Sequence, residues 1–71
     1  MTKNFVQGIL EQRDRLIELK RSIGDDLNRP EFFFYKAQLE ELIAAADAAI
    51  TGKMDTVDMI IIYKEMSEFD P

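Results

Sequence analysis

The stretch at residues 32–50, FFFYKAQLEELIAAADAAI, decides the fold predicted for this chain. Its apolar residues recur at alternating steps of three and four, which is the spacing of one face of an α-helix. They are Phe32, Tyr35, Leu39, Leu42, Ala46 and Ala49, with Ile43 and Ile50 beside them. Because a helix this apolar on one side is unstable alone in water, we expect the flanking segments to cover it.

The segment before this stretch predicts a helix over residues 4–23, which ends where Gly24 offers a left-handed C-terminal conformation. In the turn that follows, Asn28 and Glu31 have the spacing of a capping box, and Pro30 suits a first helical turn. Helices joined by so short a connection are normally antiparallel neighbours. We therefore predict an antiparallel helical hairpin made of helices 4–23 and 29–51.

Residues 55–69 are predicted as a third, C-terminal helix, with Asp55 as its N-cap. Within this segment, apolar residues recur at helical spacing after Asp55: Met59, Ile62, Met66 and Phe69. The isoleucine run at 60–62, next to Val57 and Tyr63, instead favours a strand by propensity. We prefer the helix because a single strand has nothing to pair with in a helical chain, unless it pairs across a dimer. The predicted fold class is all-α, with one domain over residues 1–71.

This third helix is apolar nearly all round, so it must be covered on more than one side. A chain of 71 residues buries only about 60% of its unfolded surface and has little left to cover it with. We therefore expect oligomerisation, as a homodimer or a larger assembly, to complete the small bundle. The residues predicted for self-association are Phe33, Phe34, Val57, Ile60, Ile61 and Tyr63.

Several kinds of chemistry lack their usual side chains. The chain has no Cys and no His, which excludes disulfides, thiolate metal sites and His-based catalytic triads. Its three glycines (Gly8, Gly24 and Gly52) are scattered and form no phosphate-binding loop. We therefore expect no enzymatic activity, no cofactor and no metal.

The charge of the chain is unevenly distributed. Residues 1–29 hold six basic and five acidic residues, a net charge of +1, whereas residues 30–71 hold three basic and nine acidic residues, a net charge of −6. This acidity disfavours direct binding to nucleic acids and to anionic membranes. It also suggests a decoy that occupies a nucleic-acid-binding enzyme. In size, acidity and lack of catalytic groups the chain resembles small accessory proteins of phages and mobile elements. The carboxylates predicted for that acidic surface are Glu40, Asp47, Glu65 and Glu68.

Two cations, Arg13 and Lys20, lie seven residues apart between apolar positions of the first helix. Their stems can cover apolar surface while the charged ends reach water. The alternative is a contact with a small anionic ligand at a subunit interface. The longest apolar run, residues 59–63, is far too short to span a membrane, and no secretory leader is visible, so we expect a cytoplasmic protein.

These observations predict a non-catalytic protein–protein interaction module that acts as a homo-oligomer. Its expected partners are a second copy of itself and another protein. The acidic inhibitor and the binder of a small anionic ligand remain the alternatives.

Overall fold

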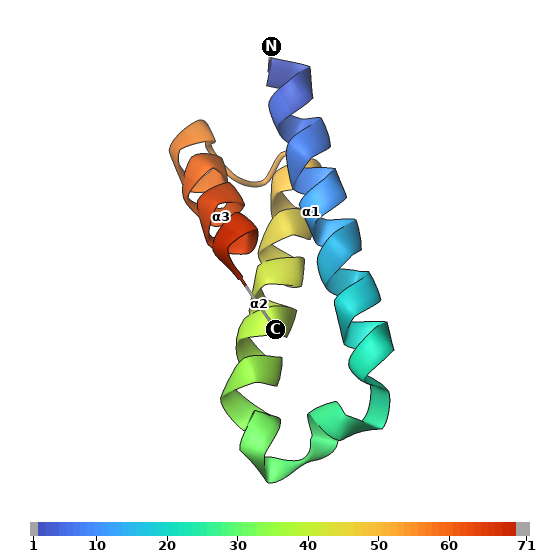
Figure 1. Ribbon diagram of the computed structural model, residues 1–71. Helices are drawn as coiled ribbons and strands as arrows, with labels where there is room; N and C mark the ends of the chain where they lie inside the picture. Colours follow the sequence, from blue (N-terminus) through green and yellow to red (C-terminus); the bar gives the residue numbers. More distant parts are fainter. Residues whose placement is uncertain (1, 70–71) are drawn as a thin grey trace.

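Three packed α-helices make up the part of the protein that the structure describes (Figure 1). The computed structural model describes the backbone of residues 2–69 and the side chains of residues 6–69. Helices α1 (Thr2–Ile23) and α2 (Phe33–Ile50) form an antiparallel hairpin, and α3 (Thr56–Glu68) packs against both of them. Because residues 2–69 contain no strand, the predicted all-α class is confirmed, and so is the helix at residues 57–63.

The tip of the hairpin differs from the prediction. Gly24 ends α1 with a φ of +65°, as expected for a left-handed residue at a helix C-terminus. The predicted capping box is wrong, because two short 3-10 turns, η1 (Gly24–Asn28) and η2 (Pro30–Phe32), precede α2. Helix α2 therefore begins at Phe33 without a side-chain cap, and Asn28 Oδ1 instead accepts a hydrogen bond from Lys36 Nζ at 3.2 Å.

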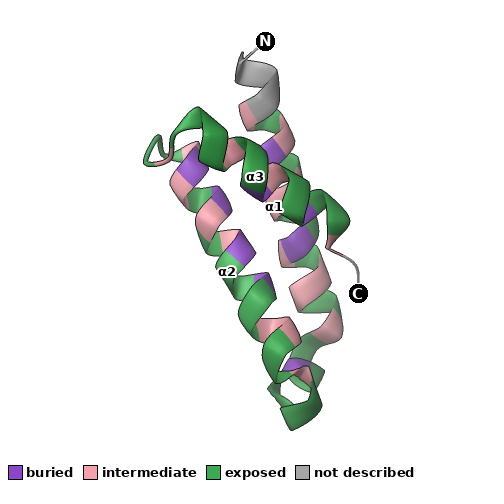
Figure 2. Ribbon diagram, turned by 90° about the vertical axis from the view of Figure 1, so that its left-hand side faces the viewer, coloured by how far each residue is buried: buried purple, intermediate pink, exposed green. Residues whose placement is uncertain are grey.

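The core contains the stripe predicted for residues 32–50. Leu39, Leu42, Ala46 and Ala49 of α2 are buried, and the other four residues of the stripe pack partly buried beside them. The other two helices and η1 complete the core with Ile9, Leu16, Leu27, Ile62 and Met66. Figure 2 shows these buried positions on the sides of the helices that face one another. The same stripe thus supports α1 on one side and α3 on the other.

Helix α3 is held at both ends and in its middle. At its start, the side chain of Asp55 accepts a hydrogen bond from the backbone N–H of Asp58 at 2.9 Å, as predicted for an N-cap. In its middle, the Tyr63 ring packs so close to Gly8 that a Cβ there would lie 3.1 Å from Tyr63 Cε1. At its end, a guanidinium N–H of Arg15 donates hydrogen bonds to the carbonyl oxygens of Met66 (2.5 Å) and Phe69 (3.4 Å).

Candidate functional site

One feature of the surface that the fold does not explain is a set of exposed apolar side chains. Five large ones are about half exposed or more: Phe33 (66%), Phe34 (84%), Val57 (65%), Ile60 (53%) and Ile61 (49%). All five belong to the six residues predicted for self-association. Their exposure leaves them available for a partner, and the association itself stays a prediction.

The structure separates these residues into two groups. Phe33 and Phe34, here called the tip pair, lie at the start of α2, with ring centroids 5.3 Å apart at an interplanar angle of 79°. Val57, Ile60 and Ile61, here called the α3 patch, lie in the first half of α3. The C-terminal end of α3 is the end nearer the tip pair, because Phe69 contacts Tyr35 with ring centroids 5.1 Å apart. The α3 patch therefore lies in the N-terminal half of α3, and the tip pair lies beyond its C-terminal end.

The sixth residue predicted for self-association, Tyr63, lies elsewhere. Its ring packs against Gly8 on α1 and is only partly exposed, so it belongs to the contact between α3 and α1. In a strand, successive side chains of residues 57–63 would point to opposite faces. The helical period instead turns Tyr63 inward and leaves Ile60 and Ile61 outside.

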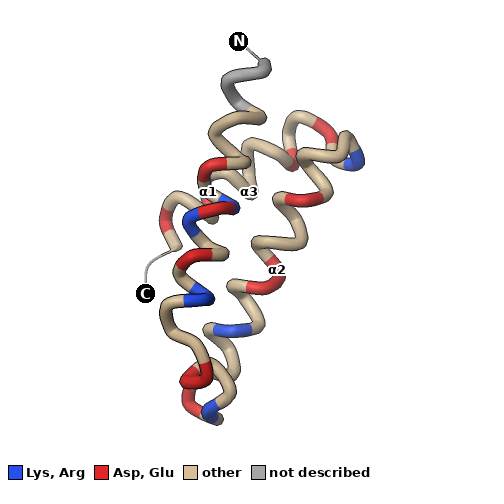
Figure 3. The backbone as a smooth tube through the Cα atoms, turned by 90° about the vertical axis from the view of Figure 1, so that its right-hand side faces the viewer, with Lys and Arg blue, Asp and Glu red and all other residues tan. Residues whose placement is uncertain are grey.

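The two predicted charged sites face each other across the hairpin. Arg13 pairs with Asp47 at 2.6 Å, and Lys20 pairs with Glu40 at 3.2 Å. Figure 3 shows basic positions of α1 beside acidic positions of α2. Since both helices place these charges seven residues apart, an antiparallel hairpin brings both pairs into register. The two predicted anion contacts thus bind carboxylates of the predicted acidic surface.

The ion pair of Arg13 and Asp47 is the more buried of the two, because the Arg13 side chain is only 26% exposed. The hydrogen bond from Arg13 to Asp47 raises the pKa of the Arg13 guanidinium, against a smaller opposing effect of burial. A raised folded-state pKa means that this stabilisation is fully present at every pH below the ordinary pKa of arginine. It is lost only as strongly alkaline pH passes the raised value.

A double-mutant cycle of Arg13→Ala and Asp47→Ala is expected to give a coupling energy of about 0.5–1 kcal/mol. The same cycle on Lys20 and Glu40 is expected to give less, because both of those side chains are nearly half exposed. Urea unfolding of the four variants of each cycle measures both values. Equal couplings, or none at Arg13 and Asp47, would contradict the geometry described above.

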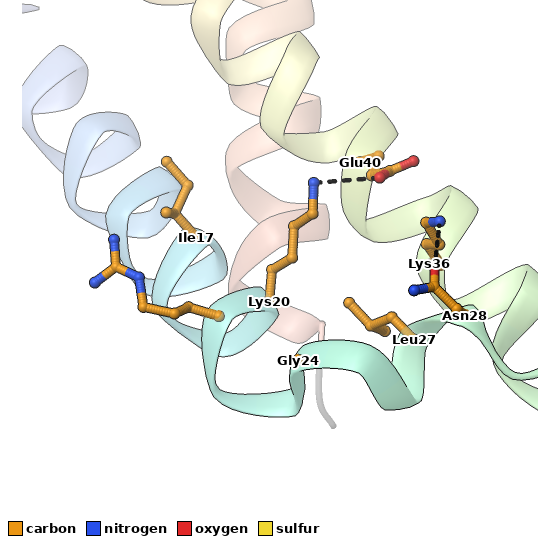
Figure 4. Close-up of a pocket in the computed structure, with 8 residues that line it drawn as sticks. Ile17, Lys20, Gly24, Leu27, Asn28, Lys36 and Glu40 are labelled. Atoms are coloured by element: carbon orange, nitrogen blue, oxygen red, sulfur yellow. Dashed lines mark hydrogen bonds and ion pairs between the residues drawn. The ribbon is translucent and has the colours of Figure 1, made fainter.

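An open hollow of about 400 Å³ lies between the end of α1, η1 and the start of α2 (Figure 4). Ile17 and Leu27 give it an apolar floor, and Lys20 and Lys36 give it positive charge. Both ammonium groups are already engaged, Lys20 with Glu40 and Lys36 with Asn28. An anion would compete with Glu40 for the charge of Lys20, so the hollow does not strengthen the prediction of an anionic ligand.

The other two predicted acidic residues, Glu65 and Glu68, border a second open hollow of about 450 Å³ with Tyr35, Gln38 and Phe69. Within residues 6–69, neither glutamate forms an ion pair. The predicted acidic surface is therefore divided: Glu40 and Asp47 are paired with cations of α1, whereas Glu65 and Glu68 are exposed on α3.

The sequence did not draw attention to Arg15, which holds the end of α3. Its partners are backbone carbonyls more than fifty positions away, and backbone groups carry no sequence signal. The ion pairs that Arg13 and Lys20 form did carry a signal in the sequence. Two cations seven residues apart occur on one helix of the predicted hairpin, and two carboxylates seven residues apart occur on the other.

Within the part of the chain whose structure is described, no helix is both long and apolar enough to cross a membrane. The same part contains no group of acidic side chains arranged to hold a metal ion. Comparisons with protein families, with curated proteins and with solved structures found no match. A functional proposal therefore depends on the exposed surface itself.

Proposed function

We propose that the protein is a non-catalytic interaction module that works as a homo-oligomer, and that α3 carries its self-association surface. The observation that supports this most strongly is the exposure of Val57, Ile60 and Ile61 together on the outside of a helix whose inner side is already buried. Contiguous exposed apolar groups on a small protein are typical of interaction sites. Figure 2, which views the molecule from the side on which α3 lies, shows this outer side of α3 largely exposed.

The dimensions of the chain support the same proposal. Its accessible surface is 5038 Å², whereas a compact monomer of 8.2 kDa exposes about 4,500 Å². Its radius of gyration is 12.5 Å, against about 11 Å for a compact domain of this length. The molecule measures 40 × 20 × 17 Å, so the excess surface comes from its elongation. A second copy laid along the molecule would cover part of that excess.

The tip pair extends the proposed surface. Phe34 precedes Gln38 by four residues and so shares its side of α2, and Gln38 borders the hollow next to α3. Phe34 is therefore on the side of α2 that α3 occupies, just beyond the end of α3. A partner that lies on α3 and projects past its C-terminal end can reach Phe34, whose aromatic ring suits it as an anchor.

The acidic-decoy alternative loses strength from the ion pairs. Carboxylates that imitate a row of phosphates must face the partner unneutralised, and Glu40 and Asp47 are each bound to a cation of α1. Glu65 and Glu68 alone make a short acidic surface. We therefore place self-association first.

The test is the oligomeric state of an Ile61→Asp variant. The wild-type protein is expected to sediment above the 8.2 kDa of one chain at micromolar concentration, because the α3 patch is covered. Ile61→Asp places a charge in that interface and is expected to give a monomer with unchanged helical circular dichroism. Sedimentation velocity measures both.

The matched control is Ala44→Asp, which adds the same charge at an exposed position of α2. It is expected to leave the wild-type assembly intact. If the wild-type protein sediments as an 8.2 kDa monomer throughout the micromolar range, the proposed function is wrong.

A further inference from the structure

We propose that two copies dock antiparallel across their α3 helices, with a two-fold axis close to Ile61. This inference rests on the proposed function and adds to it the orientation and the centre of the interface. The occupant of the α3 patch is thus the outer side of α3 of a second copy.

The outer side of α3 is one continuous ridge. Its residues recur at steps of four, three and four: Val57, Ile61, Lys64 and Glu68. They lie opposite Ile62 and Met66, which face the core, and Ile60 widens the ridge on one side. Its N-terminal half is apolar and its C-terminal half is charged, so the orientation of a second copy changes which groups meet.

A two-fold axis parallel to α3 would set every ridge residue against the same residue of the second molecule. Lys64 would face Lys64 and Glu68 would face Glu68, and like charges in contact are destabilising. The axis of an isologous pair can instead lie across the helix, which makes the two copies of α3 antiparallel. Each residue of one molecule is then level with the residue of the other molecule that lies equally far along the helix on the other side of the axis.

The charges of α3 favour an axis at residue 61. Lys64 is the one basic residue of α3, and Asp58 is an acidic residue of its first turn. Ile61 lies midway between them along the helix, so an antiparallel pair centred there sets Lys64 of each copy at the height of Asp58 of the other, which lies at the edge of the ridge, about 100° round the helix from Val57. Within residues 6–69, neither side chain has an ion-pair partner. The same docking lays the methylene stem of Lys64 near Val57 of the second copy.

Single-cysteine variants test this geometry cleanly, because the chain contains no Cys. A disulfide needs Cα atoms within about 7 Å of each other. At 1.5 Å per residue, an axis at residue 61 separates the two copies of position 57 by about 12 Å along the helix and those of position 68 by about 21 Å. After mild oxidation, Ile61→Cys is expected to form a covalent dimer, and Val57→Cys and Glu68→Cys are expected to stay uncrosslinked.

The outcomes separate this inference from the proposed function. Crosslinks at 57 and 68 as well as 61 would mean a parallel pair, and crosslinks at none of them in a protein that still dimerises would mean another interface. Either result overturns the antiparallel docking and leaves self-association standing. A wild-type protein that is monomeric in sedimentation overturns both.

Discussion

Replacing Leu39 by alanine is expected to leave most of the protein unfolded. Leu39 is fully buried in α2, within the stripe that supports both α1 and α3. A buried Leu→Ala change costs about 2–5 kcal/mol, because it removes apolar contacts and leaves a cavity. A core in a chain of this size supplies only about 3–5 kcal/mol in total. Urea titration followed by far-UV circular dichroism measures the loss.

The control for this prediction is Glu41→Ala, two residues further along the same helix at an exposed position. Its effect is expected to be within about 0.5 kcal/mol of zero, as for most surface substitutions. A Leu39→Ala variant as stable as Glu41→Ala would contradict the core described here.

Replacing Arg15 by alanine is expected to loosen α3 more than the rest of the bundle. The Arg15 guanidinium donates to the carbonyl oxygens of Met66 and Phe69, at the end of α3, where helical carbonyls have no partner of their own. A cation also interacts favourably with the negative end of the helix. Since the side chain is exposed and only its hydrogen bond to Met66 is partly buried, its loss should cost about 1 kcal/mol.

Amide hydrogen exchange measures where this loss falls. Faster exchange is expected at residues 62–66 of α3, with α1 and α2 changed less. Arg21→Ala is the matched control, because within residues 6–69 Arg21 pairs only with Glu18 of its own helix, and its side chain is 72% exposed. Arg15→Lys keeps the charge but not the planar guanidinium, so it should recover part of the stability. Equal exchange in Arg15→Ala and Arg21→Ala would rule out the role of Arg15 in holding α3.

Loosening α3 would also test how folding and self-association are linked. Under the proposed function, the α3 patch can dock only while Ile62, Met66 and Tyr63 hold the opposite side of the helix against the core. Arg15 lies outside the α3 patch, so a weaker assembly in Arg15→Ala would reflect the seating of α3. The Ile61→Asp variant acts on the patch directly and leaves that seating intact.

The hairpin tip shows where local sequence signals failed. Asn28 and Glu31 have the spacing of a capping box, yet Asn28 accepts its hydrogen bond from Lys36 on the facing turn of α2. The 3-10 turns of this segment let Leu27 reach the core, where it is 4% exposed. Burial of a leucine outweighs a cap worth about 1 kcal/mol, so the chain follows the core.

The amino-acid sequence by itself determined the helices, the buried stripe of α2, the glycine that ends α1 and the aspartate that caps α3. These features depend on residues within a few positions of one another, and helical periodicity expresses them directly. Only the tertiary structure decided that Arg13 and Lys20 bind Asp47 and Glu40, that Arg15 holds the end of α3, and that Tyr63 packs on Gly8 while Ile60 and Ile61 stay outside. Those outcomes depend on the register and rotation of one helix against another, which side-chain packing between distant segments sets.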